Sequence, residues 1–161
     1  AGETPASSDA GYVVREARAA DVDVLVSFTL AEAREAEGYA ADPAAVRRGI
    51  AAAFAPNPPS AYWVAEQGGV AVAAISVITE WSNFRGGHYW WIQSLFVAPE
   101  HRGRGVLELL FDRVMSSARQ AGALDVRLYA HEANSRALRV YDRLGFGRTP
   151  YVIMKKDLVA R

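Results

Sequence analysis

The sequence contains no cysteine. This absence excludes disulfide bonds, thiolate metal sites and any covalent intermediate carried by a cysteine. It is compatible with a reducing compartment, and we expect a cytoplasmic protein. The three histidines, His88, His101 and His131, show neither HxxxH nor HExxH spacing, so no metal site is predicted.

An excess of charge of either sign is also lacking, because 18 basic and 18 acidic residues cancel. The composition therefore favours neither a nucleic acid nor a membrane surface as a partner. The triplet Arg85-Gly86-Gly87 is interpreted as a turn rather than an RNA-binding segment. No apolar run approaches the roughly 18 residues that are needed to span a bilayer, so no membrane association is expected.

What the sequence does contain is enough apolar material for one core. Its 161 residues suit a single compact domain, and 51% of them are hydrophobic, which allows a full core. Residues 1–10 are small, polar and proline-containing, which predicts a disordered lead-in. We expect one domain over residues 11–161.

The hydrophobic periodicity predicts an alternating series of strands and helices. Asp21 is a candidate cap for the first helix, Pro43 fits the first turn of the second, and Asn134 is a good N-cap for the last. The order predicts a mixed α/β sheet with helices on both faces. The expected strands are 12–15, 62–65, 70–79, 88–97, 124–129 and 152–154, and the expected helices begin near residues 21, 43, 106 and 134.

The most informative stretch is Ser94–Val114. An apolar strand at 95–97 leads into the turn Arg102-Gly103-Arg104-Gly105, after which an apolar stripe at helical spacing begins at Val106. The first N–H groups of a helix are unpaired and carry partial positive charge, so a glycine-bearing turn with two arginines suits a phosphate group. The alternative is a tight β-to-α turn with two solvent-facing arginines.

Two motifs in this chain resemble those of a known family. Residues 97–106 read VAPEHRGRGV and resemble the acyl-CoA-binding motif of the GNAT superfamily of N-acetyltransferases. Residues 134–146 read NSRALRVYDRLGF and are similar to the second signature of that family. The chain departs from the first motif at Leu107, where the family usually has glycine or alanine. The side chain of Leu107 either crowds the phosphate or points into the core.

The resemblance implies a fold and an activity. The GNAT fold implies a mixed, mostly antiparallel sheet of six to seven strands, with helices on both faces and a splay between the fourth and fifth strands. The activity implied is transfer of an acetyl group from acetyl-CoA to a primary amine of a small molecule or peptide. With no cysteine available, direct attack in a ternary complex is expected. The family is also compatible with a homodimer.

The resemblance further implies roles for particular residues. The N–H of Leu95 is the candidate oxyanion donor. The hydroxyl of Tyr141 is the candidate proton donor for the leaving thiolate; the alternative is a core tyrosine that hydrogen-bonds a carbonyl group. The residues expected to bind acetyl-CoA are Leu95, Phe96, Val97, Arg102, Gly103, Arg104, Gly105, Val106, Leu107, Asn134 and Tyr141.

The general base is not identified by the motifs. Gln93 stands where many relatives carry a glutamate, and an amide cannot accept a proton at neutral pH. Either water relays the proton, or Glu80, His88 or His131 acts.

Aromatic residues with a few carboxylates suit a cationic amine acceptor. The residues expected to contact the acceptor are Glu80, Trp81, Trp91, Gln93 and Tyr39. The charged segment 32–42 is expected to face the same opening. These aromatics could instead fill the core, cover a sheet edge or form a dimer contact.

Two other functions fit the same sequence. One is a non-catalytic acyl-CoA sensor that kept the phosphate-binding turn and lost the base, for which Gln93 and Leu107 argue. The other is an unrelated phosphate- or nucleotide-binding α/β domain that uses the RGRG turn alone.

Overall fold

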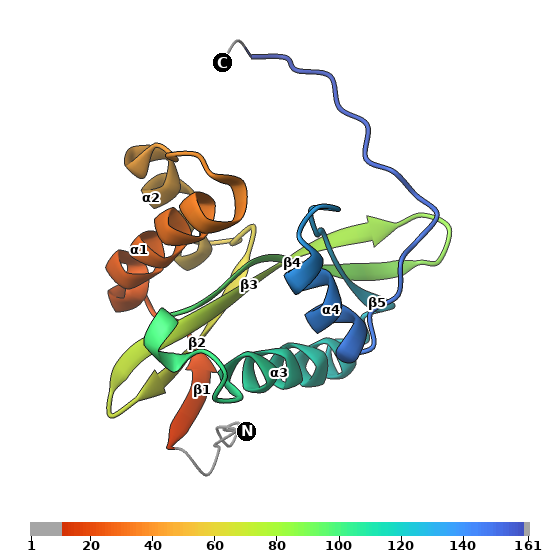
Figure 1. The fold of residues 1–161 in the computed structure, drawn as a ribbon. Coiled ribbons are helices and arrows are strands. Elements are labelled where there is room, and N and C mark those ends of the chain that lie inside the picture. The colour runs from red at the N-terminus through yellow and green to blue at the C-terminus, as the bar shows by residue number, and fades with distance from the viewer. Residues whose placement is uncertain (1–10, 160–161) are drawn as a thin grey trace. The chain divides into compact units, whose positions relative to one another are not determined.

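The computed structural model describes residues 11–159, so the expected lead-in at residues 1–10 lies outside the described residues. The chain divides after Tyr129 into two compact units. The first unit contains one sheet with three α-helices, and the second contains one α-helix and an extended C-terminal segment (Figure 1).

The sheet of the first unit follows the chain order β1-β2-β3-β4-β5. The first four strands pair antiparallel, and β5 joins β4 in parallel. The strands are β1 (Tyr12–Glu16), β2 (Ala61–Gln67), β3 (Val70–Ser82), β4 (Gly87–Val97) and β5 (Asp125–Leu128).

The expectation of six to seven strands is wrong, since residues 11–159 form five. The strand predicted at 152–154 is the error, because these residues carry no strand and pair with no neighbour within the described chain. Their side chains are apolar and β-prone, but a strand also requires hydrogen bonds from a second strand. That requirement is non-local, so the local pattern could not establish it.

Helices cover both faces of the sheet in the first unit, as expected (Figure 1). On one face lie α1 (Val22–Glu32) and α2 (Pro43–Ala51), and on the other lies α3 (Val106–Gln120). A π-helical turn, η2 (Ala33–Glu37), extends α1, and 3-10 turns occur at Ala19–Asp21, Ala52–Phe54 and Pro99–His101.

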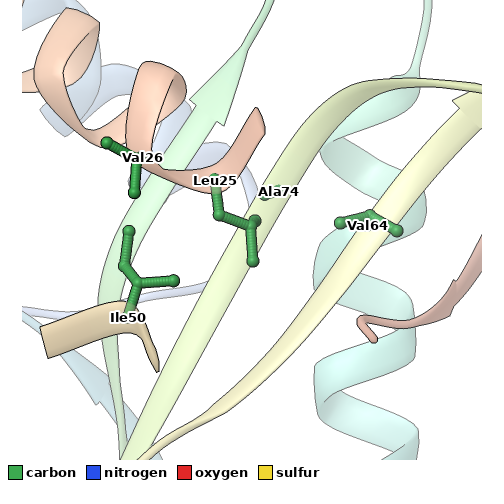
Figure 2. Packing of buried hydrophobic residues seen from close by; sticks show 5 residues of the cluster. All are labelled: Leu25, Val26, Ile50, Val64 and Ala74. Carbon is green, nitrogen blue, oxygen red and sulfur yellow. The ribbon is translucent and has the colours of Figure 1, made fainter. Parts of the chain in front are cut away.

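The core explains why the middle strands are apolar on both faces. Under α1 and α2, Leu25, Val26 and Ile50 pack on Val64 and Ala74 of the sheet (Figure 2). The opposite face receives the predicted stripe of α3, and Val106, Leu110, Val114 and Ala118 are all buried there. Strands β2 and β3 therefore have helices on both sides, as in doubly covered sheets.

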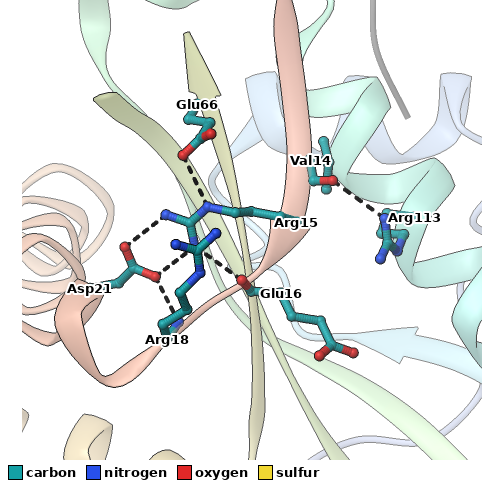
Figure 3. Close-up of polar contacts among 7 residues, drawn as sticks. All are labelled: Val14, Arg15, Glu16, Arg18, Asp21, Glu66 and Arg113. Carbon is teal, nitrogen blue, oxygen red and sulfur yellow. Dashed lines mark hydrogen bonds and ion pairs between the residues drawn. The ribbon is translucent and has the colours of Figure 1, made fainter. Parts of the chain in front are cut away.

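A partly buried ion-pair network fixes the entry into α1 (Figure 3). Arg15 donates from Nη1 and Nη2 to Asp21, at 2.8 and 3.0 Å, and from Nε to Glu66 at 2.9 Å. The hydrogen bond from Arg15 is the main cause that holds the pKa of Asp21 below its usual range. The prediction that the side chain of Asp21 caps α1 is wrong. Its carboxylate instead accepts hydrogen bonds from Arg15 and from the N–H of Arg18.

The second unit contains α4 (Ser135–Arg143). As predicted, the side chain of Asn134 caps it by accepting from the N–H of Ala137 at 3.1 Å. Gly145 adopts a left-handed φ of 90°, and the N–H of Phe146 donates to the carbonyl of Tyr141. The predicted Asn134 cap is confirmed because its signal is local in the sequence, and the left-handed Gly145 ends the helix.

Candidate functional site

The candidate site begins where β4 extends past the end of β5. The two strands are paired from Tyr89–Asp125 to Ile92–Leu128, whereas β4 continues to Val97. A β-bulge lies at this point, because Ser76 pairs with Ser94 and Val77 with Ile92, which leaves Gln93 as the extra residue. Bulges are common beside active sites because they redirect the backbone.

The outer edge of β4 beyond the bulge is occupied by side chains. The N–H of Leu95 donates to Oε1 of Glu32 at 3.1 Å, and the carbonyl of Val97 accepts from Nε of Arg102 at 2.9 Å. A carboxylate thus lies against the N–H of Leu95, which the family resemblance makes a candidate oxyanion donor. The edge can hold a negatively charged oxygen, and it offers both a donor and an acceptor to an extended ligand.

The turn after β4 leads into α3 and contains the two glycines of the RGRG stretch. Gly103 and Gly105 have left-handed φ values of 72° and 81°, which residues with side chains rarely adopt. Gly105 is the N-cap residue of α3 and, as a glycine, makes no side-chain capping bond. Leu107 is half-buried. The open N-terminus of α3 is therefore available to an anion.

The two arginines of this turn differ. Arg102 lies back over β4, with its guanidinium 5.5 Å from the ring centroid of Phe96 and 2.7 Å from Oε2 of Glu35. Arg104 is exposed. Arg104 thus makes no described contact that holds it back, while Arg102, although partly exposed, ties η2 to the edge of β4.

A row of hydroxyl groups crosses the sheet beside Glu32, and the sequence analysis missed it. Tyr62, Ser76 and Ser94 lie opposite one another in the β2-β3-β4 register, and the Oγ atoms of Ser76 and Ser94 are 2.5 Å apart. Burial raises the pKa of the Tyr62 hydroxyl, hydrogen bonds from both serines oppose this change, and the charge of Glu32 adds to it. The three hydroxyl groups thus bond to one another, and the charge of Glu32 acts on the Tyr62 hydroxyl.

Glu32 was also missed, although the sequence carries a signal for it. Glu32 follows Leu25 by seven residues and so shares the helix face of that buried side chain. A carboxylate at the end of an apolar stripe is directed toward the sheet rather than toward solvent. The sequence placed segment 32–42 at the opening without distinguishing this residue from its charged neighbours.

The expected acceptor residues are divided between the two faces of the sheet. Because side chains alternate along β3, Glu80 and Trp81 point to opposite faces. Trp91 pairs with Ile78, two residues before Glu80, and shares the face of Glu80. Trp81 instead packs edge-on against His88, with ring centroids 5.0 Å apart.

The other residues predicted to contact the acceptor or acetyl-CoA differ in exposure and in their contacts. Gln93 and Tyr39 are exposed. Trp91 stacks on Tyr129 at 4.5 Å between ring centroids. In the second unit, Tyr141 packs edge-on against Phe146, and the side chain of Asn134 is occupied as a helix cap.

Residues 11–159 lack two kinds of feature. No group of three or more histidine, aspartate or glutamate side chains in residues 11–159 could hold a metal ion. No helix in that range combines the length and the apolar character that crossing a membrane requires.

Comparison with protein families gives a match over most of the chain. Residues 31–146 match the acetyltransferase (GNAT) family. This range contains the edge of β4, the glycine turn and α4. Both motifs singled out in the sequence fall within it.

Curated relatives are similar over part of their length. N-acetyltransferase family 8 member 2 of Rattus norvegicus is 30% identical over 105 residues, which are 64% of this chain and 46% of the relative. The L-methionine sulfoximine/L-methionine sulfone acetyltransferase of Salmonella typhimurium is 30% identical over 83 residues, 52% of this chain and 48% of the relative. The chain thus spans less than half the length of these relatives.

Solved structures share the fold. A possible acetyltransferase from Clostridium difficile 630 superposes with a TM-score of 0.87 at 28% identity, covering 92% of this chain and 99% of that one. A predicted acetyltransferase from Clostridium acetobutylicum, solved with acetyl-CoA, has a TM-score of 0.75 at 20% identity, over 90% of this chain and 96% of that one.

Proposed function

Because the chain belongs to the GNAT family of acetyltransferases, we propose that it transfers an acetyl group from acetyl-CoA to a primary amine. The acceptor is a small molecule or a peptide. Acetyl-CoA supplies an acetyl group activated as a thioester, while the chain binds, orients and stabilises charge. Direct attack within a ternary complex suits a chain without cysteine.

One observation carries this proposal. The N–H of Leu95 holds a carboxylate oxygen at 3.1 Å on the part of β4 that β5 does not pair with. That oxygen stands in for a carbonyl oxygen that becomes negative under attack by an amine. A backbone donor fixed in a strand requires no reorganisation to stabilise such charge.

The residues present fit acetyl-CoA. The backbone of Leu95 to Val97 offers an edge to the pantetheine arm, and the first turn of α3 offers open N–H groups to the pyrophosphate. The left-handed glycines of the preceding turn have open space where a Cβ would be added, so the backbone is accessible. We assign the predicted set over residues 95–97 and 102–107 to this donor, together with Asn134 and Tyr141.

Support for an amine acceptor comes from the relatives. Both curated relatives described above are acetyltransferases, and the Salmonella enzyme is named for methionine derivatives. By the likeness of residues 134–146 to the family signature, we propose Tyr141 as the proton donor to the leaving thiolate. We further propose a cytoplasmic location and, as a family property, a homodimer.

The proposal is tested in two steps. Calorimetric titration with acetyl-CoA compares the wild type with the double variant Arg102→Ala/Arg104→Ala, and we expect micromolar binding that the variant weakens at least tenfold. A panel of primary amines is then screened for CoA release with a thiol reagent. Because the chain has no cysteine, the protein contributes no background.

The outcomes distinguish the predicted functions. Binding followed by amine-dependent thiol release supports an acetyltransferase. Binding without release from any amine would instead identify an acyl-CoA sensor. No binding of acetyl-CoA by the wild type would contradict both, and Leu107 would be the first position to replace with glycine.

A further inference from the structure

We propose that Glu32 is the residue that accepts the proton from the acceptor amine. This inference rests on the proposed function and supplies the general base that the motifs leave unassigned. It also defines the acceptor class, because a carboxylate at this position favours an acceptor that arrives as a cation.

The position of Glu32 is the first argument. It is the last residue of α1, and the π-helical turn η2 follows immediately. Its Oε1 atom lies 3.1 Å from the nitrogen of Leu95, the proposed donor to the carbonyl oxygen under attack. A group at this point lies within a few ångströms of that carbonyl, which is the distance at which a base must meet the attacking nitrogen.

The surroundings of Glu32 are the second argument. Its side chain is half-buried, and its charge contributes to the raised pKa of Tyr62. Ser76 and Ser94 hydrogen-bond each other and Tyr62 in the same row. The Tyr62 hydroxyl, on which the charge of Glu32 acts, and the two serines bonded to it can orient an amine or pass on a proton.

The other polar groups of the first unit that come into question as a base are less well placed. Gln93 is the bulge residue and carries no titratable group. Glu80 is exposed near the far end of β3, and His88 packs against Trp81 there. Glu35 is already paired with Arg102 at 2.7 Å.

With Glu32 as the base, acetyl transfer is balanced in bonds and protons. Glu32 releases the N–H of Leu95 and takes one proton from the ammonium group of the acceptor, which leaves a neutral amine. The amine nitrogen forms a bond to the carbonyl carbon, and the bond from that carbon to sulfur breaks. The nitrogen loses a second proton, which balances the one that the thiolate gains. Glu32 finally returns its proton to solvent, so the net products are an amide, a thiol and one proton.

The test compares Glu32→Gln with Asp23→Asn. Asp23 lies on the same helix but is exposed and paired only with Arg47 among the contacts described, so the control removes one carboxylate of α1 away from β4. We expect Glu32→Gln to lower kcat/KM for the amine about 100-fold at neutral pH, the size typical of a lost general base. The affinity for acetyl-CoA should stay within about threefold.

The pH profile separates a base from a structural role. In the wild type, kcat/KM should fall at low pH as the carboxylate is protonated. In Glu32→Gln the rate should instead rise about tenfold per pH unit with the neutral fraction of the amine. A fluorinated ethylamine that is already neutral at pH 7 should largely rescue the variant, whereas a misfolded variant would not be rescued.

A second readout does not depend on turnover. In 15N NMR spectra of the free protein, the Leu95 amide should shift with pH as Glu32 titrates, and this shift should be absent from Glu32→Gln and present in Asp23→Asn. Absence of the shift in the wild type would overturn the contact itself.

Failure of this inference is distinguishable from failure of the proposed function. A wild type that acetylates no amine overturns the proposed function and the inference with it. An active wild type with an equally active Glu32→Gln of the same pH profile overturns the inference alone. Tighter acetyl-CoA binding by an active Glu32→Gln would show that Glu32 only covers the N–H of Leu95, which also overturns it.

Discussion

Arg102 and Val97 are joined by a hydrogen bond of 2.9 Å from the guanidinium Nε to the backbone carbonyl oxygen. The same guanidinium pairs through Nη2 with Glu35. Arg102 therefore closes the edge of β4 instead of extending toward the N-terminus of α3. If Arg102 is to contact a phosphate, it must first leave Glu35.

This competition predicts that Glu35→Gln strengthens acetyl-CoA binding. Both side chains are partly exposed, 34% for Arg102 and 49% for Glu35, and such pairs contribute about 0.2–1 kcal/mol. We therefore expect a gain of up to about fivefold in affinity by calorimetry. In an Arg102→Ala background the gain should vanish, whereas weaker binding by Glu35→Gln would show that the pair positions Arg102 for the ligand.

A second prediction concerns stability and Asp21. The hydrogen bond from Arg15 is the main cause that lowers the pKa of this carboxyl, so the ionised form stabilises the fold. That contribution is complete above the unfolded pKa of about 3.9 and is lost as pH falls through the lower folded pKa. Urea unfolding at pH 7 should show that Asp21→Asn costs about 2 kcal/mol, because Arg15 loses a buried partner.

The same measurement over a pH series provides the control. The difference between wild type and Asp21→Asn should be constant from pH 7 to 5 and shrink below about pH 4. Asp23→Asn, which alters an exposed side chain, should cost less than about 0.5 kcal/mol at every pH. A difference that grows toward low pH would contradict the sign of the shift.

The sequence predicts those parts of the fold whose signals are local. The apolar stripe that begins at Val106 and the Asn134 cap each depend on residues within a few positions of one another, and both are observed. The strand at 152–154 fails because strand formation depends on a partner that no local pattern specifies.

In the candidate site, too, features with local signals could be predicted and features that depend on distant residues could not. The glycine turn could be predicted because its dihedral angles and its helix start are encoded in consecutive residues. The contact between Glu32 and Leu95 could not be predicted, because it joins residues 63 positions apart. It depends on how the end of α1 packs against the part of β4 that extends beyond β5. Helix periodicity predicts only that Glu32 faces the sheet.

A third prediction distinguishes Trp91 from Trp81. Trp91 lies on the same face of the sheet as Ser76 and Ser94. Its ring makes a cation–π contact with Arg127, whose guanidinium carbon lies 5.7 Å from the ring centroid. Trp91→Ala should raise KM for a cationic acceptor about tenfold, since a cation–π contact contributes roughly 1–2 kcal/mol. Trp81→Ala, on the other face, should leave KM nearly unchanged; the reverse ranking would place the acceptor on the α3 side.

The last prediction concerns Tyr141. A phenol hydroxyl placed beside a leaving thiolate can give it a proton. Tyr141→Phe keeps the ring that packs against Phe146 and removes only the hydroxyl, so kcat should fall about 100-fold while acetyl-CoA affinity barely changes. Tyr151→Phe, at an exposed position, is the matched control and should behave as wild type. If Tyr141→Phe turns over at the wild-type rate, the thiolate takes its proton from another donor, and Tyr141 has only a packing role in α4.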